Sequence, residues 1–491
     1  MPAFRRLALL SLLSSAAPLF AQTCGEPKLV NGLDLEMPCI KYRGQNYAVT
    51  LDNLSATALT WRFNGKIAAA TCTPAPDSCA TLTPDLGLLS VRQLEIGGTR
   101  HRAELALAPQ LGNMTWQYKS HSLEPTTLSV LTPTVLAAIK SYMEQLVSAK
   151  TIPGAVLGVA EGSNLTLIEA YGMADASTST AMRTDSLLHI ASTNKPITSF
   201  LLATLVDDGA LTWDTKARDI YSGFNPANAN SAANITVRQM LDMTSGLPRE
   251  AGFETNEPPR KMLDGLSKVA LVGTPGEKYT YSNVSTSAAG YLAALAKTKM
   301  TRALSDFDLD TVYTGYTTLL QDKVLKPIGM TASYLSVTDA RATGKMAKSH
   351  SLVNGVWAVS ASVDTAVDNA APSGGLKSNV TDMLRYIVTD MQGGVNPAGT
   401  RVASAANVAE RQKLSVGPAS ANKYGLCLEI GTAENGLALV SHTGTFDNFN
   451  SVMGWFPDKK VAFVLMTNGD SAGITDLTGG GFIKRLAEIV R

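Results

Sequence analysis

The spacing of hydrophobic and polar positions changes along this chain of 491 residues. Between residues 22 and 123, short runs rich in β-branched and aromatic residues, such as YAVTLDNL and ALTWRFNG, alternate with Gly, Pro and Asn. Runs of this kind predict a small β-rich module over residues 22 to 130. The stretch SLEPTTLSVLTPT, residues 122 to 134, is rich in Pro, Thr and Ser, and it predicts a linker at the end of that module.

From residue 131 to 491 the pattern predicts a second, α/β domain. Apolar residues recur at helical spacing from Val135 to Val147, and the strand-like runs GAVLGVA and LTLIEAYG follow. The run SFLLATLV is apolar on nearly every face, which predicts a helix inside the core. Strand-like runs return late in YGLCLEI, LALVSH, NSVMGWF and VAFVLMT, before a helix expected from about Thr475 to Val490. Strands at both ends with helices between them predict one sheet flanked by helices, with a helical subdomain.

Charge and the N-terminus limit the possible partners and the location. Lys and Arg total 42 against 41 Asp and Glu, and no block of like charge occurs, so a nucleic-acid partner is disfavoured. Residues 1 to 21 carry two arginines, a short apolar run and small residues ending at Ala21, which is typical of a cleavable signal peptide. No apolar run reaches membrane-spanning length. We therefore expect a periplasmic or secreted protein without a membrane span.

Cysteine placement favours structural disulfides over a metal site. Cys24, Cys39, Cys72 and Cys79 all fall in the first eighty residues, and in an oxidising compartment they predict two disulfides. Of the three possible pairings, Cys24 to Cys39 with Cys72 to Cys79 is favoured because it joins the nearest partners. No histidine lies among them, so we expect no metal and no cofactor. Cys427, in YGLCLEI, is expected to be a buried strand thiol.

The stretch HIASTNKPITSF carries the first candidate for catalysis. Ser192 and Lys195 are three residues apart, which places them on one side of a helix. A serine hydroxyl needs a base to become a nucleophile, and a desolvated lysine near a helix N-terminus can be that base. Pro196 supports a helix start here. The spacing alone is weak, because Ser420 and Lys423 repeat it in a polar stretch.

Two further motifs supply groups that such a serine would need. Tyr281 and Asn283 lie in YTYSN just before an Ala-rich run, where a phenol could relay protons with the lysine and an amide could bind a substrate carbonyl. A capping Asn with a packed tyrosine is the ordinary alternative. Thr443 and Gly444 follow a strand-like run, and glycine lets a substrate lie along the backbone.

His442 opens that third motif, and Thr445 closes it. The N-H groups of Thr445 and Ser192 could together form an oxyanion hole. The ordinary alternative for His442 is a strand-end histidine with satisfied hydrogen bonds. Each motif is weak alone, but the order Ser192-x-x-Lys195, Tyr281-Ser-Asn283, His442-Thr-Gly is specific.

In these three motifs the chain resembles the penicillin-recognising serine hydrolases, which include class C β-lactamases, D-alanyl-D-alanine carboxypeptidases and family VIII esterases. The stretches LVDDGALTWD, ITVRQMLDMTSGLP and APSGGLKSNVTDMLRY add to the resemblance, which covers about residues 133 to 491. It implies an antiparallel sheet flanked by helices. It also implies that Ser192 is acylated, that Lys195 and Tyr281 share the proton transfer, and that Asn283 touches the acyl side chain.

One departure from the family pattern bears on the substrate. Class C enzymes carry a lysine where this chain has His442, and a neutral imidazole offers less positive charge to a substrate carboxylate. The resemblance therefore implies hydrolysis of a D-amino-acid peptide or a related small molecule, with carboxylesterase or β-lactamase action as alternatives. A binding or sensor domain acylated without turnover is the alternative of another class. The sequence offers no dedicated base for deacylation.

A second serine motif needs separate consideration. GDSAG, residues 469 to 473, fits the G-x-S-x-G pattern of an α/β-hydrolase nucleophile at Ser471. That fold places its histidine after the serine, and no histidine follows His442. We therefore expect Ser471 to be a turn residue.

Overall fold

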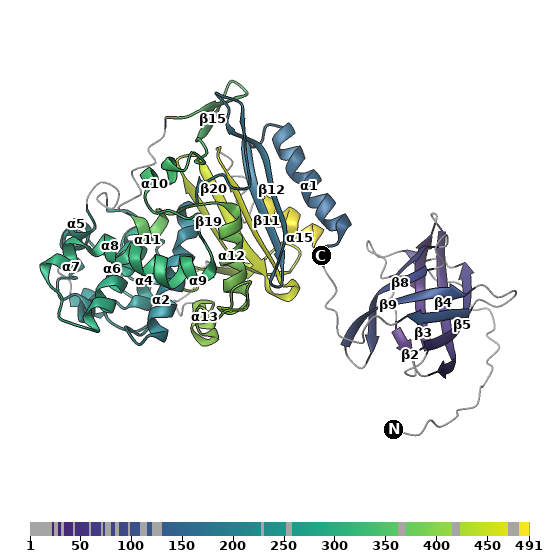
Figure 1. Cartoon of the computed structure of the whole chain (residues 1–491). Helices are drawn as coiled ribbons and strands as arrows, with labels where there is room; N and C mark the ends of the chain where they lie inside the picture. Colours follow the sequence, from purple (N-terminus) through teal and green to yellow (C-terminus); the bar gives the residue numbers. More distant parts are fainter. Residues whose placement is uncertain are drawn as a thin grey trace. The chain divides into compact units, whose positions relative to one another are not determined.

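The computed structural model divides the chain into two compact units, Met1–Ser129 and Val130–Arg491 (Figure 1). In the first unit the structure describes only the backbone of the strands between Gln22 and Lys119. In the second it describes residues 130 to 490 apart from the segments 227–229, 252–257, 362–369, 415–422 and 470–480.

The described strands of the first unit pair in the order β2-β3-β4-β5-β10-β9-β8-β7, with an additional pairing of β2 with β8. Cys24 and Cys79 lie outside the described residues, and only the backbone of Cys39 and Cys72 is described. The predicted disulfides therefore stay a prediction, as does the signal peptide over residues 1 to 21. The strands are β1 (Gln22–Thr23), β2 (Lys28–Val30), β3 (Asp34–Tyr42), β4 (Gln45–Thr57), β5 (Thr60–Ala69), β6 (Cys72–Thr73), β7 (Ala80–Thr83), β8 (Leu88–Ile96), β9 (Thr99–Ala108) and β10 (Thr115–Lys119).

A seven-stranded sheet forms the centre of the second unit, and all its neighbouring strands are antiparallel. The order β13-β12-β11-β21-β20-β19-β18 brings the two ends of the unit together where β11 pairs with β21. The sheet that the sequence predicts is thereby confirmed. Its strands are β11 (Gly154–Glu161), β12 (Asn164–Asp175), β13 (Thr180–Ala181), β18 (Glu429–Thr432), β19 (Ala438–Phe446), β20 (Phe449–Phe456) and β21 (Val461–Thr467).

Helices α1 (Pro133–Ser148) and α15 (Phe482–Ile489) cover one face of the sheet (Figure 1). Ile139 of α1 and Leu486 of α15 are buried in one cluster with Phe463 of β21. Because side chains alternate across a strand, the apolar runs of the central strands can fill cores on both faces. The late helix that the sequence predicts therefore exists, and its described part begins at Phe482.

The opposite face of the sheet carries α12 (Val380–Met391), and α2 (Asn194–Asp207) lies among the helices of the helical subdomain beside it (Figure 1). Nearly all of α2 is buried, as its apolar sequence predicts. The other helices of this region are α3 (Ala217–Ile220), α4 (Val237–Leu241), α5 (Pro259–Gly265), α6 (Asn283–Lys299), α7 (Asp306–Asp310), α8 (Val312–Leu320), α9 (Lys326–Ile328), α10 (Val337–Ala342), α11 (Ala371–Gly374) and α13 (Ala405–Arg411). Short helical turns complete it at η2 (Ala191–Thr193), η4 (Asn230–Asn234), η5 (Leu266–Lys268), η6 (Gln321–Leu325) and η8 (Pro457–Lys459). Two short strand pairs join the loops. They are β14 (Leu188–His189) with β17 (Lys377–Ser378), and β15 (His350–Val353) with β16 (Val356–Val359).

One predicted strand is wrong over most of its length. The run YGLCLEI was expected to be a strand, but only its last two residues belong to β18. Cys427 is buried as expected, yet its backbone is left-handed, with φ at 60°. The N-H of Leu426 bonds to the carbonyl of Arg411 and that of Cys427 to the carbonyl of Leu241, so this backbone finds its partners outside the sheet. Alternation of apolar residues alone could not reveal those partners.

Within the described residues, no helix is long and apolar enough to cross a membrane.

Candidate active site

Ser192 lies in the short helical turn η2, directly before α2. The residue before it, Ala191, has a left-handed backbone with φ at 48°, a conformation that costs energy for a residue with a Cβ. Hydrogen bonds hold this turn, since the hydroxyls of Thr193 and Ser451 both donate to the carbonyl of Ile190 at 2.6 Å. The strained turn leaves Ser192 partly exposed between buried neighbours.

Lys195 is completely buried in the first turn of α2. Its Nζ lies 2.9 Å from Oγ of Ser192 and 2.7 Å from the carbonyl oxygen of Ser373 in α11. Burial lowers the pKa of Lys195 to about 7. The amine is therefore able to exist unprotonated near neutral pH, in the form that can accept the proton of the Ser192 hydroxyl.

Tyr281 reaches the same serine from the start of α6. Its partly buried side chain hydrogen bonds with Ser192, and Nζ of Lys195 lies 5.0 Å from the centre of its ring. Burial raises the pKa of Tyr281 well above its usual range, so the phenol is protonated at rest. Ser282 holds the backbone next to Tyr281 in place. Its hydroxyl accepts from the N-H of Ser285, which caps α6, and donates to the carbonyl of Pro248 at 2.6 Å.

Asn283 is the first residue of α6 and lies two residues after Tyr281. Its Nδ2 donates to Oε1 of Glu250 at 2.5 Å, whereas its Oδ1 is enclosed and has no hydrogen-bond partner among the described residues. The guanidinium carbon of Arg249 lies 5.1 Å from the centre of the Tyr281 ring. An enclosed amide oxygen without a donor is unfavourable unless a ligand supplies one.

The third motif lies beside the serine on β19. A Cβ added at Gly444 would stand 2.8 Å from the backbone nitrogen of Ser192 and 2.6 Å from both the Ile190 carbonyl and the Ser451 hydroxyl. Only glycine lets the strand approach the nucleophile this closely. Thr445, next along the strand, is exposed and donates its hydroxyl hydrogen to Asn450.

His442 is fully buried and electrically neutral. Its Nδ1 lies 2.6 Å from the carbonyl oxygen of Thr443, which can only accept a hydrogen bond, so Nδ1 carries the proton. Nε2 is then an acceptor, and the hydroxyl of Tyr424, 2.9 Å away, donates to it. Burial, helped by the charge of Lys195, lowers the pKa of His442 to about 3. The ring of Tyr281 lies 6.2 Å from its ring.

One side of β19 next to Ser192 is left without a strand partner in the described part of the chain. On that side β18 pairs with β19 only from Ala438 to Ser441, whereas β20 pairs with the other side from Val440 to Phe446. A free strand edge is a template for an extended peptide backbone. The edge over residues 442–446 therefore offers a place for a substrate to lie.

The structure brings Ser192, Lys195, Tyr281 and His442 together, with Gly444 alongside. Sequence reasoning missed their supporting partners, which are Ser373, Glu250, Arg249 and Tyr424. Ser373 acts through a backbone carbonyl and so leaves no side-chain signal. Ser420 and Ser471, the other serines considered, lie outside the described residues.

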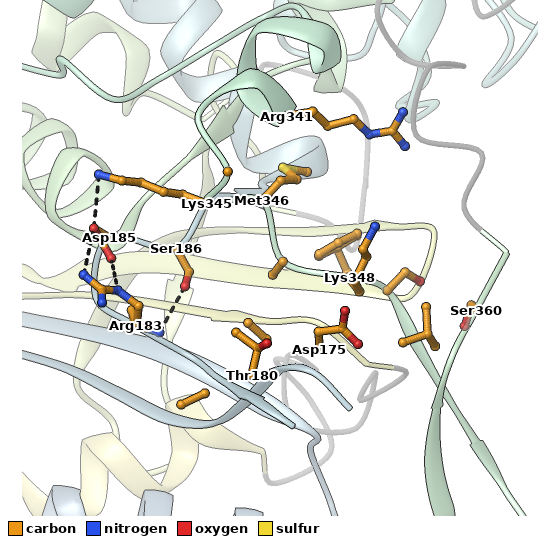
Figure 2. Close-up of a pocket in the computed structure, with 17 residues that line it drawn as sticks. Asp175, Thr180, Arg183, Asp185, Ser186, Arg341, Lys345, Met346, Lys348 and Ser360 are labelled. Carbon is orange, nitrogen blue, oxygen red and sulfur yellow. Dashed lines mark hydrogen bonds and ion pairs between the residues drawn. The ribbon is translucent and has the colours of Figure 1, made fainter. Parts of the chain in front are cut away.

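A separate cavity of about 810 Å³ lies between β12, β13 and the loops around α10 (Figure 2). Arg183, Asp185 and Lys345 form a charged group at one end, with Asp185 bonded to both cations. None of the reactive residues described above lines this cavity. It is therefore not the reactive centre.

This fold, with a serine one turn from a buried lysine, defines a class of serine hydrolase. The family model described as Beta-lactamase matches residues 139–478, and the chain belongs to that family. Among the described residues, no cluster of three or more potential metal ligands occurs.

Several curated proteins are similar in sequence. Penicillin-binding protein 4 of Amycolatopsis lactamdurans is 27% identical over 259 residues, which is 52% of this chain and 64% of that protein. The unguisins hydrolase ungD' of Aspergillus campestris is 25% identical over 69% of this chain and 62% of its own. Esterase EstB of Burkholderia gladioli is 32% identical over 127 residues, 26% of this chain and 32% of that protein. The chain thus spans less than two thirds of the length of these relatives.

Solved structures share the fold. The D-amino acid amidase of Ochrobactrum anthropi SV3 has a TM-score of 0.57 at 21% identity, covering 73% of this chain and 98% of that one. The octameric penicillin-binding protein homologue of Pyrococcus abyssi has a TM-score of 0.57 at 18% identity, covering 69% and 75%. At these identities the likeness concerns the fold alone.

Proposed function

We propose that this protein hydrolyses an amide or ester bond through an acyl-enzyme on Ser192, acting on a D-amino-acid peptide or a related D-amino-acid derivative. The distance of 2.9 Å between Nζ of Lys195 and Oγ of Ser192, with the lysine fully buried, carries the proposal. A buried lysine that has no carboxylate partner among the described residues has a poor structural justification, whereas a base for the serine needs this arrangement.

The acylation step follows from the arrangement of these groups. As Oγ of Ser192 attacks the substrate carbonyl carbon, its proton passes to the Lys195 amine, directly or through the Tyr281 hydroxyl. The carbonyl oxygen becomes negative and is stabilised by backbone N-H donors, for which Ser192 and Thr445 are proposed, each contributing on the order of 3 kcal/mol. When the bond to the leaving nitrogen or oxygen breaks, the same proton passes to the leaving group.

Water completes the reaction by attacking the Ser192 ester. Lys195 and Tyr281 are within reach of that carbonyl, so the proposal gives them the second proton transfer as well. His442 is neutral and its Nε2 is occupied by Tyr424, so we propose a structural and substrate-facing role for it rather than a catalytic one. Thr443 and Gly444 would then flank the substrate along the free edge of β19.

The groups around Asn283 bear on the substrate class. Asn283 has an enclosed oxygen free to accept from a substrate N-H, and Glu250 lies beside it. Both fit an amino-acid derivative with an amide or amine next to the reactive carbonyl. The name of the fold neighbour, D-amino acid amidase, is consistent with D-configured substrates.

Hydrolysis assays with matched enantiomers test this function. We expect the protein to release ammonia from D-phenylalanine amide or D-alanine from D-alanyl-D-alanine derivatives, with little action on the L-forms, and Ser192→Ala to be inactive. Catalysis that survives intact in Ser192→Ala would refute the proposal. Persistent acylation by penicillin without any turnover would instead favour a sensor domain.

The location remains a proposal. We propose export to the periplasm or medium, because residues 1–21 have the pattern of a signal peptide. Mass analysis of the protein from its native source should show an N-terminus after Ala21.

A further inference from the structure

Glu429 is an acidic residue at the candidate active site that the reaction above does not use. It is the first residue of β18 and stands opposite Ser441, immediately before His442 on the neighbouring strand. It also forms a backbone bridge with Tyr424, the donor to His442. Its Oε2 atom is enclosed by protein and has no hydrogen-bond partner in the described part of the chain. An enclosed carboxylate oxygen without a partner is unfavourable unless a ligand completes it.

The pairing of β18 with β19 places Glu429 at one end of the free edge of β19, residues 442–446, along which the substrate is proposed to lie. β18 stops pairing with β19 at Ser441, and the free edge starts at His442. The chain cannot continue β18 along that edge, because it turns away at the left-handed Cys427. A substrate lying on the edge would occupy the line that β18 leaves, so its end would meet Glu429.

The charge of Glu429 affects the pKa values of Tyr281 and Tyr424, two tyrosines of the candidate active site. Burial is the main cause of the raised pKa of Tyr281 and of Tyr424, and the carboxylate of Glu429 adds to both. The leaving group must take its proton from Tyr281 or Lys195. It therefore has to lie on the side of Ser192 where these two residues are. Glu429 is therefore placed to meet the leaving-group end of a substrate.

Neither His442 nor Arg249 supplies a compensating positive charge at this end. His442 is neutral, and Arg249 on the Tyr281 ring is accompanied by Glu250 at 3.8 Å. Burial raises the pKa of Glu429 to about 7, and a hydrogen bond with Ser441 opposes that rise, so the carboxyl is negative in alkaline solution. A substrate carboxylate here would face a like charge, which is strongly unfavourable in a partly desolvated site.

We propose that Glu429 is a specificity-determining residue that selects leaving groups ending in a carboxamide or an amine and rejects those ending in a carboxylate. This inference rests on the proposed function and narrows it from D-peptides in general to D-amino-acid amides and amidated or amine-bearing D-peptides. Free-carboxylate peptides of the D-alanyl-D-alanine type become poor substrates.

Binding measured without turnover tests this subsite separately from catalysis. In the Ser192→Ala background, the affinities of N-acetyl-D-alanyl-D-alaninamide and N-acetyl-D-alanyl-D-alanine are compared by calorimetry at pH 8.5. We expect the amide to bind roughly tenfold tighter or more. Adding Glu429→Gln should bring the two affinities together by strengthening the carboxylate ligand. Glu434→Gln is the matched control, because Glu434 lies in the turn that follows β18, half exposed and paired with Lys484, and it should leave the preference unchanged.

Each outcome of these binding measurements either supports or overturns the proposed role of Glu429. The subsite would be overturned if the two peptides bind equally well before Glu429 is substituted or if the preference persists after that substitution. It would also be overturned if neither peptide binds. Hydrolysis of either peptide by the protein with Ser192 intact would still support the proposed function in those cases. Conversely, a Glu429-dependent preference without any hydrolysis would support the subsite and count against turnover.

Discussion

Lys195 is the residue whose chemistry depends most on its surroundings. An exposed lysine is protonated at neutral pH, and burial in α2 brings the pKa of this one to about 7. Since the base is the unprotonated amine, acylation should be slow in acid, reach half its maximum near pH 7 and level off above it. The pH dependence of kcat/KM measures this. Lys195→Arg should stay inactive across the range, because a guanidinium keeps its proton. A rate that rises as the pH falls below 6 would contradict the assignment.

Tyr424 matters because it fixes the state of His442. Its hydroxyl is the donor to Nε2, and Tyr424→Phe would leave a buried acceptor without a partner. We expect that change to lower the free energy of unfolding by about 1–3 kcal/mol and to reduce activity. Denaturant unfolding measures the first effect. Tyr221→Phe, which removes a hydroxyl bonded to Asp264 at an exposed site, should cost less and serves as the control. Equal losses in the two variants would argue against the buried pair.

At the scale of elements, the site depends on how closely β19 approaches η2. Gly444→Ala would place a Cβ 2.6 Å from the Ile190 carbonyl, so the strand must move away from Ser192. We expect a loss of activity of at least about 100-fold, as small displacements of reacting groups commonly cause. Gly431→Ala on β18 has open space around the new Cβ and should keep its activity. Steady-state kinetics of the two variants compare them directly, and a fully active Gly444→Ala would show that the strand does not border the nucleophile.

The elements also show where sequence patterns suffice. The buried helix α2 and the strands β11, β20 and β21 have apolar patterns strong enough to predict them, and the three motifs named reactive groups that the structure brings together. Cys427 shows the limit. Its apolar neighbours resemble a strand, but their backbone bonds go to Leu241 and Arg411, residues far away in the sequence. The free edge of β19, and with it the position of Glu429, depends on that turn and could not be predicted from alternation.

At the scale of the whole second unit, a buried ion pair connects the nucleophile helix to the rest of the fold. Arg411 and Asp390 are both completely buried and 2.7 Å apart, and Arg411 also donates to the carbonyl of Pro196 and the hydroxyl of Ser199 in α2. The sequence holds many arginines and aspartates, and nothing in their spacing identifies this pair, because α12 and α13 meet only in the folded structure.

Breaking that pair should destabilise the fold. Arg411→Met leaves Asp390 buried without its partner, and we expect a loss of about 3–5 kcal/mol in the free energy of unfolding. Arg485→Ala, which removes a half-exposed pair with Glu488, should cost less than about 1 kcal/mol. Urea unfolding of the two variants provides the comparison. If the two losses are alike, the buried pair does not hold α2 in place.

The proposed mechanism requires that Ser192 itself becomes acylated, and intact-mass analysis followed by peptide mapping measures this step. After brief exposure to a D-amino-acid ester or a penicillin, we expect the mass to increase by one acyl group on the peptide containing Ser192. The increase should disappear over time with a true substrate and should never form in Ser192→Ala. An adduct on another residue, or the same adduct in Ser192→Ala, would show that Ser192 is not the nucleophile.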